Sequence, residues 1–207
     1  NLLAAARSLA SPPLNEELEG EIQIATPADA HMISECLARS PRRDFVATDP
    51  TEIAGQIGRG DSVYMVLKES VSGVTTGKCK AVVAARLDRM RKTAEIIHFE
   101  YDDYEVSRNM LKQLVRSLER YVRIRHSITD FYASVISDRF ASNGLFADLE
   151  YEYTGRLLNN YRIDDEWQSA NIWCRSSVRR SASTRIPPEE LSMQHSESKY
   201  GRAGIAM

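Results

Sequence analysis

The chain has 207 residues, of which 43% are hydrophobic and 27% charged, and its formal net charge is −2 at pH 7. This length suits one globular domain with tails, and the near-neutral charge excludes a protein that attracts nucleic acid or an anionic membrane through its overall field. No apolar run approaches the roughly 18 residues of a membrane-spanning helix, so we expect no membrane insertion.

The use of cysteine points to a reducing compartment, and the histidines give no metal signal. The three cysteines, Cys36, Cys79 and Cys174, are too few and too scattered for a disulfide framework or a zinc site, and we expect buried thiols. The four histidines show no ligand spacing, so we predict no metal site. The first residues lack a basic leader before a short apolar stretch, so we expect no signal peptide and a cytoplasmic protein.

Periodicity and turn residues predict an alternation of strands and helices. The order is strand, two helices, three strands, helix, strand, helix and a closing hairpin. The predicted ranges are 21–25 (strand), 27–40 and 52–57 (helices), 62–68, 80–88 and 94–101 (strands), 107–126 (helix), 131–137 (strand), 140–149 (helix), and 153–162 with 167–175 (hairpin).

Particular residues set the helix starts. Thr26 can cap the first helix and Pro27 suits its first position, while Asp49-Pro50 starts the second. Ser107 is a good cap for the long helix, whose apolar residues recur on one face. The turn-rich stretch 70–77 is expected to connect two strands.

The closing hairpin carries a resemblance to a known family. Its characteristic sequence motifs are Gly155-Arg156-Leu157, Tyr161-Arg162 and Asp164-Asp165-Glu166-Trp167. These motifs resemble the last hairpin of the GCN5-related N-acetyltransferases (GNAT), especially those that acylate protein N-termini or ribosomal proteins. The predicted order of strands and helices also agrees with that family. The resemblance implies an α/β fold: a mixed, mostly antiparallel twisted sheet flanked by helices.

We therefore divide the chain into three parts. An N-terminal extension covers residues 1–20, the GNAT-like domain covers 21–175, and a flexible or docked tail covers 176–207. The tail is rich in Ser, Arg and Pro and has few large apolar residues, a composition that disfavours a packed core.

In the family, glycines at the start of the helix after the fourth strand let backbone amides approach the cofactor's pyrophosphate. The matching stretch, residues 104–111, has no glycine, and Leu111 is expected to crowd the phosphates. The helix start persists, so the resemblance implies acetyl-CoA or another acyl-CoA as cofactor. The residues expected to hold it are Ser107, Arg108, Asn109 and Met110.

The family's proton donor is missing, because Phe146 stands where the usual tyrosine would protonate the leaving thiolate. On the fourth predicted strand of this domain, where the family often places its base, strict alternation puts Ile96, His98 and Glu100 on one side. Glu100 is the leading candidate base, with His98 beside it. The alternative interpretation is that both are polar residues exposed to solvent.

Two functions stay open at this point. The first is N-acyl transfer, in which an amine of a small molecule or protein attacks the thioester of an acyl-CoA or acyl carrier. The second is a catalytically inactive GNAT-like module that binds a protein or an anionic ligand, which the combined loss of glycines and tyrosine favours. A basic ridge on the long helix offers a protein contact or is simply a solvated face, and consists of Arg108, Lys112, Arg116 and Arg120.

Overall fold

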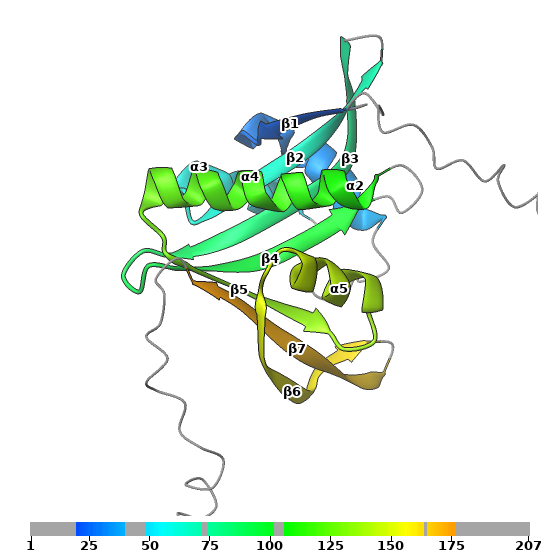
Figure 1. Cartoon of the computed structure of the whole chain (residues 1–207). Helices are drawn as coiled ribbons and strands as arrows, with labels where there is room; N and C mark the ends of the chain where they lie inside the picture. The colour runs from blue at the N-terminus through cyan, green and yellow to red at the C-terminus, as the bar shows by residue number, and fades with distance from the viewer. Residues whose placement is uncertain (1–19, 40–48, 72–73, 102–105, 164, 177–207) are drawn as a thin grey trace, which may run out of the picture. The chain divides into compact units, whose positions relative to one another are not determined.

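The computed structural model describes residues 20–39, 49–71, 74–101, 106–163 and 165–176, so almost all of the predicted extension and tail lies outside the described residues. Figure 1 shows the elements in order. They are β1 Gly20–Ile24, η1 Pro27–Asp29, α2 Ala30–Ala38, α3 Pro50–Arg59, β2 Ser62–Val71, β3 Val74–Asp88, β4 Thr93–Tyr101, α4 Arg108–His126, β5 Asp130–Ile136, α5 Phe140–Asp148, β6 Glu152–Ile163 and β7 Glu166–Ser176.

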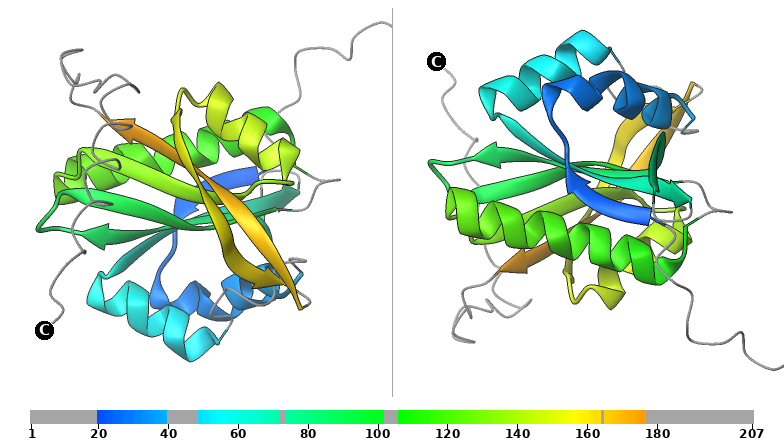
Figure 2. Two further views of the ribbon diagram at one scale, coloured as in Figure 1. Left: turned by 90° about the horizontal axis from the view of Figure 1, so that it is seen from below. Right: turned by 90° about the horizontal axis from the view of Figure 1, so that it is seen from above.

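One seven-stranded sheet organises these elements, in the order β1-β2-β3-β4-β5-β7-β6. All neighbouring strands are antiparallel except β4 and β5, which run parallel. Helix α4 covers one face of the sheet, and α2 and α3 cover the other (Figure 2). The predicted fold class, a mixed and mostly antiparallel sheet flanked by helices, is confirmed.

The two sheet faces form two hydrophobic cores because side chains alternate along each strand. The first, here called the α4 core, joins α4 residues such as Leu114 and Leu118 to α5 and to strand residues such as Val83. The second, the α2–α3 core, joins Ile33 of α2 and Ile53 of α3 to the opposite face of the same strands. Each central strand therefore contributes to both layers.

The cysteines follow this layering only in part. Cys36 and Cys79 are buried, as predicted, whereas Cys174 in β7 is partly exposed. The expectation of a third buried thiol is wrong because β7 pairs with β6, an edge strand whose residues are mostly exposed. Within the described ranges, no helix is long and apolar enough to cross a membrane.

Strands β2 and β3 are longer than predicted, and the expectation of a turn-rich connection over 70–77 is wrong. The two strands stay paired out to Val71 and Val74, as a ladder that projects past β1 (Figure 1). The register of the two strands shifts near Lys68. The sequence there lacks the regular alternation from which a strand is predicted. Backbone hydrogen bonds pair the two strands along this projecting ladder.

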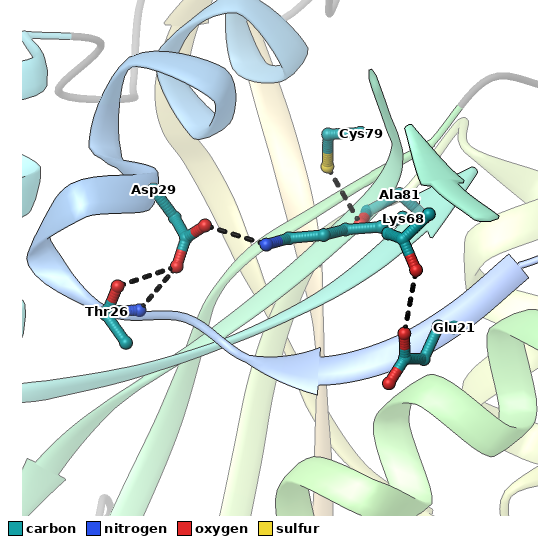
Figure 3. Close-up of polar contacts among 7 residues, drawn as sticks. Glu21, Thr26, Asp29, Lys68, Cys79 and Ala81 are labelled. Atoms are coloured by element: carbon teal, nitrogen blue, oxygen red, sulfur yellow. Dashed lines mark hydrogen bonds and ion pairs between the residues drawn. The ribbon is translucent and has the colours of Figure 1, made fainter. Parts of the chain in front are cut away.

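A charged contact fastens the start of α2 to the sheet (Figure 3). One oxygen of Asp29 accepts hydrogen bonds from the amide and hydroxyl of Thr26, at 2.8 and 2.9 Å, and the other accepts from Lys68 Nζ of β2 at 2.8 Å. Partial burial raises the pKa of Asp29, but the bonds from Lys68 and Thr26 outweigh it, so the net pKa lies below its usual value. The ionised carboxylate therefore stabilises the fold.

We expect Asp29→Asn to lower the free energy of unfolding by roughly 1–2 kcal/mol at pH 7. A carboxylate with a lowered pKa stabilises the fold above its unfolded pKa of about 3.9, so the difference from wild type should shrink as the pH falls below that value. Urea unfolding monitored by circular dichroism measures both quantities. Asp61→Asn, which alters an exposed ion pair with Arg59, is the control and should change stability by less than ~0.5 kcal/mol. A difference that does not depend on pH would contradict the ionic contribution.

Candidate active site

The two parallel strands at the centre of the sheet separate partway along their length. The ladder between β4 and β5 joins residues 93–96 to residues 130–133 and ends there. Beyond this point the strands run apart, with β4 heading toward α2 and β5 toward α5 (Figure 1). The last residues of β4 therefore form no ladder with β5.

A β-bulge in β4 lies at the same position. On the β3 side, Ile96 pairs with Ala85 but His98 pairs with Ala84, so Ile97 is an extra residue in β4. A bulge bends its strand and increases the local twist. The bend begins directly after Ile96, the last residue that pairs with β5, and we attribute the separation of the two strands to it.

The bulge also changes which residues share a face. Ile96 belongs to the α4 core, whereas His98 and Glu100 pair with Ala84 and Val82 of the α2–α3 core. The prediction that Ile96 lies on the same side as these two residues is therefore wrong, because the extra residue Ile97 moves His98 and Glu100 to the opposite side. The expectation that His98 and Glu100 lie on one side holds.

His98 and Glu100 are both buried, with exposed fractions of 6% and 8%. The alternative interpretation, that both face solvent, is wrong, because α2 and α3 cover this side of the strand. Burial lowers the pKa of His98 to about 4, and the positive charge of Arg86 contributes. The imidazole is therefore neutral at pH 7.

One ring nitrogen of His98 is buried without a partner in the described part of the chain. Its Nδ1 atom is buried and has no hydrogen-bond partner among the described residues. The Tyr64 ring lies 5.8 Å away between centroids, and its hydroxyl donates to Gln56 Oε1 of α3 at 2.9 Å. Helix α3 thus holds the aromatic neighbour of His98 in place.

A second pair of polar side chains lies on the same face, beyond the end of the β4–β5 ladder. Phe131, Ala133 and Val135 of β5 belong to the α4 core, so Ser134 faces the opposite side of the sheet. Tyr161 of β6 donates its hydroxyl hydrogen to Ser134 Oγ at 2.8 Å. Sequence reasoning did not join these residues, because their contact depends on how the hairpin folds back onto β5.

The start of α4 keeps the features expected of an anion site. Ser107 is the cap, as predicted, and its Oγ accepts from the Met110 amide at 3.3 Å. The first amides of a helix have no carbonyl partner within it and carry a partial positive charge. The expectation that Leu111 crowds this position is wrong, because its side chain is buried in the α4 core. Asn109 is exposed.

Arg108 and Lys112 reach from α4 to α5. Arg108 Nε donates to Asp148 Oδ2 at 2.9 Å, and Lys112 Nζ lies 3.4 Å from the same oxygen. These hydrogen bonds lower the pKa of Asp148. A Cβ atom at Gly144 would lie 3.0 Å from the Arg108 guanidinium, so glycine provides the room for this side chain. Two residues of the basic ridge are thus positioned, and partly neutralised, by α5.

Phe146 of α5 is the residue that the sequence resemblance aligns with the tyrosine of GNAT enzymes. It is almost fully buried and packs edge-to-face against Phe99, at 6.0 Å, and Tyr151, at 5.0 Å. The side chain therefore supports the core and has no proton to donate.

Asn143 is a residue whose role sequence reasoning missed. Its Nδ2 donates to the carbonyls of Ile136 and Arg139 at 3.0 and 2.8 Å, and its Oδ1 accepts from Asn171 and from Trp173 Nε1 at 3.0 and 2.8 Å. It fixes α5 to the end of β5 and to β7. An asparagine inside a predicted helix is itself a signal, because its amide competes for backbone partners.

A surface hollow of about 460 Å³ lies around Asp88, Thr93 and Glu95, at the opposite end of β4 from Glu100. Its charged side chains already pair with protein groups, as in the contacts Arg86–Glu95 and Arg91–Asp88. We therefore assign the site from the strand divergence rather than from this hollow. Among the described residues, no cluster of His, Cys, Asp and Glu could hold a metal ion.

Comparisons with known proteins agree with this architecture. No family model matches the chain. Over 99 residues it is 32% identical to Beta-lysine N(6)-acetyltransferase of Methanosarcina mazei, a stretch that covers 48% of this chain and 36% of that protein. The chain therefore spans about a third of the length of this curated relative.

Solved structures match over a larger part of the chain. Ribosomal-protein-S5-alanine acetyltransferase from Vibrio fischeri aligns with a TM-score of 0.64 and 10% identity, over 79% of this chain and 96% of that one. The dodecameric spermidine N-acetyltransferase from Vibrio cholerae gives 0.61 and 11%, over 76% and 94%. An N-acetyltransferase from Staphylococcus aureus gives 0.62 and 15%, over 76% and 98%.

These matches identify the fold. The chain has the GNAT fold. The fold that we predict from the sequence of the closing hairpin is therefore confirmed. The parallel pair β4–β5, its divergence after the bulge and the helix that follows β4 are the parts of the fold that matter for the site.

We expect His98 to titrate with a midpoint of about 4 in an NMR titration, assigned with His98→Gln. An unfolded histidine binds its proton near pH 6.5, so acidification from about 6.5 to 4 should cost the wild type up to roughly 3 kcal/mol of stability. His98→Gln should lose less stability over this range, whereas the exposed control His31→Gln should behave like wild type. A midpoint near 6.5 would contradict the buried position.

Proposed function

We propose that the chain is an N-acyltransferase that transfers an acyl group from an acyl-CoA thioester, acetyl-CoA foremost, to an amine. The observation that carries the proposal is the divergence of β4 and β5 directly after the bulge at Ile97. A capped helix start at Arg108 and the buried polar residues His98 and Glu100 accompany it. The identity to a lysine-derivative acetyltransferase supports an amine acceptor.

We assign the cofactor's pyrophosphate to the start of α4. Backbone amides of Arg108 and Asn109 offer donors there, Ser107 shapes the turn by accepting from the Met110 amide, and the helix dipole favours an anion. The guanidinium of Arg108 adds positive charge, although Asp148 shares it. Burial of Leu111 in the α4 core leaves the first turn accessible despite the missing glycines. When bound, acyl-CoA supplies an acyl group activated as a thioester.

The residues of β4 serve the acceptor amine in this proposal. Glu100 removes a proton from the attacking amine, directly or through water, as the bond from nitrogen to the acyl carbon forms and the carbon–sulfur bond breaks. Neutral His98 orients the acceptor or an intervening water through Nδ1, which has no partner among the described residues. An amine of a small molecule or of a protein fits this arrangement.

The leaving thiolate needs a proton that Phe146 has no means of supplying. We assign this role to the hydroxyl pair Tyr161–Ser134, which lies on the same face of the sheet as Glu100. The pair comes from the hairpin and β5, so the hairpin takes part in the chemistry as well as closing the sheet.

Cofactor binding is tested by thermal shift. Acetyl-CoA at 100 times its dissociation constant should stabilise the chain by about 2.7 kcal/mol. Arg108→Glu should weaken acetyl-CoA binding at least ~10-fold, because it places a negative charge beside the phosphates. Arg125→Glu, at the other end of α4, is the matched control and should bind as wild type. No shift with any acyl-CoA would remove the enzyme proposal and leave a binding module.

The base is tested by acetyl transfer to primary amines, including β-lysine and spermidine. Glu100→Gln should lower kcat by a factor of about 100 or more and leave acetyl-CoA affinity unchanged, because the residue acts on the amine. Glu35→Gln, an exposed change on α2, is the control. Full activity of Glu100→Gln would assign the proton to another acceptor.

A further inference from the structure

A basic hollow lies far along α4 from the proposed cofactor site. It has a volume of about 270 Å³, and its lining is Arg116, Glu119, Arg120, Arg123, Ile124 and Arg175. Four of these six side chains are guanidinium groups and one is a carboxylate. Because an α-helix rises 1.5 Å per residue, Arg116 and Arg120 lie roughly 12–18 Å along the axis from Arg108.

The single carboxylate already has its partners in the protein. Glu119 is 3% exposed in its side chain, and its Oε1 accepts from the Tyr151 hydroxyl at 2.7 Å. Its Oε2 accepts from Arg175 at 3.2 Å and lies 3.6 Å from Arg123. Arg123 also lies over the Phe131 ring, at 5.1 Å from the centroid. Arg175 also lies 3.6 Å from Glu150 Oε2. Glu119 therefore fixes two guanidinium groups at the hollow, and the two carboxylates leave Arg116 and Arg120 without an ion pair among the described residues.

The hollow retains donors that the protein does not satisfy. Arg123 Nε is buried and has no hydrogen-bond partner among the described residues. Arg116 and Arg120 are exposed, and neither forms a hydrogen bond or ion pair with a described residue. Like charges four residues apart on a helix repel each other. A bound anion would relieve this repulsion and satisfy the donors.

We propose that this hollow binds a phosphate group. The planar guanidinium group matches the oxygens of phosphate through paired hydrogen bonds, which explains why arginine rather than lysine suits such sites. A water molecule occupies about 30 Å³ in the liquid, so the hollow has room for a phosphate with several waters, or for two linked phosphates. The high ratio of guanidinium to carboxylate favours a multiply charged oxyanion over a single carboxylate.

The site is separate from the acyltransferase chemistry in both position and residues. The basic ridge that the sequence presents as one feature divides in two: Arg108 and Lys112 pair with Asp148 of α5, whereas Arg116 and Arg120 face the hollow beside β7. A phosphate-bearing ligand held there contacts the second half of α4 and Arg175 of β7. Its binding does not require acyl-CoA.

Isothermal titration of the full chain tests the proposal, with inorganic phosphate, pyrophosphate and glycerol 3-phosphate at constant ionic strength. We expect the double variant Arg116→Gln/Arg120→Gln to weaken binding of the tightest probe at least ~10-fold. Arg125→Gln, a basic residue of α4 outside the hollow, should bind as wild type. Both changed arginines are exposed, so the variant should fold, and circular dichroism is the measurement that checks this.

Arg108→Gln separates this site from the cofactor site. It should weaken acetyl-CoA binding while phosphate binding at the hollow persists, and the double variant should do the reverse. Preference for inorganic phosphate or for the phosphomonoester identifies the source of the group, and either supports the proposal. Unchanged phosphate affinity in the double variant, loss of phosphate binding in Arg108→Gln alone, or equal binding of a polyglutamate peptide would overturn it.

Discussion

The extra residue at Ile97 constrains the arrangement of the whole centre of the sheet. Up to Ile96, β4 is hydrogen-bonded on both edges, to β3 and to β5, and after it the ladder to β5 ends. A parallel ladder offers evenly spaced donors and acceptors, and a bent strand cannot keep that register with a straight neighbour. The same bulge turns His98 toward the layer of α2 and α3. Strand separation and burial of the candidate acceptor-side residues therefore have one cause.

Polar contacts hold the surrounding layers at fixed positions around this centre. Asp29 ties the start of α2 to β2, Asn143 ties α5 to β5 and β7, and Glu119 ties α4 to β7. Each of these side chains is satisfied by several partners, which is how a polar group tolerates burial without a large free-energy cost. Helix α4 presents two chemically different ends: one is capped and ion-paired to α5, and the other carries Arg116 and Arg120, which form no ion pair with a described residue.

Much of the fold could be read from local signals in the sequence. Ser107 before an apolar stripe predicted α4, and Asp49-Pro50 predicted the start of α3, because caps and prolines act within a few residues. The acidic turn between two β-favouring runs predicted the β6–β7 hairpin. The projecting end of β2 and β3 was missed, since its strands are held by backbone bonds without a repeating apolar pattern. The position of Leu111 was also misjudged, because its burial depends on how α4 rolls against the sheet.

The sequence by itself determined the order of elements, the family resemblance, the caps and the pairing of His98 with Glu100 on one side of a strand. Only the tertiary structure decided that these two residues are buried, that Tyr161 meets Ser134, and that the basic ridge divides between two neighbours. The physical reason is the range of the forces involved. Capping and periodicity act within a few residues, whereas burial, strand divergence and ion pairing depend on segments that are distant in the chain and become neighbours only when the sheet forms.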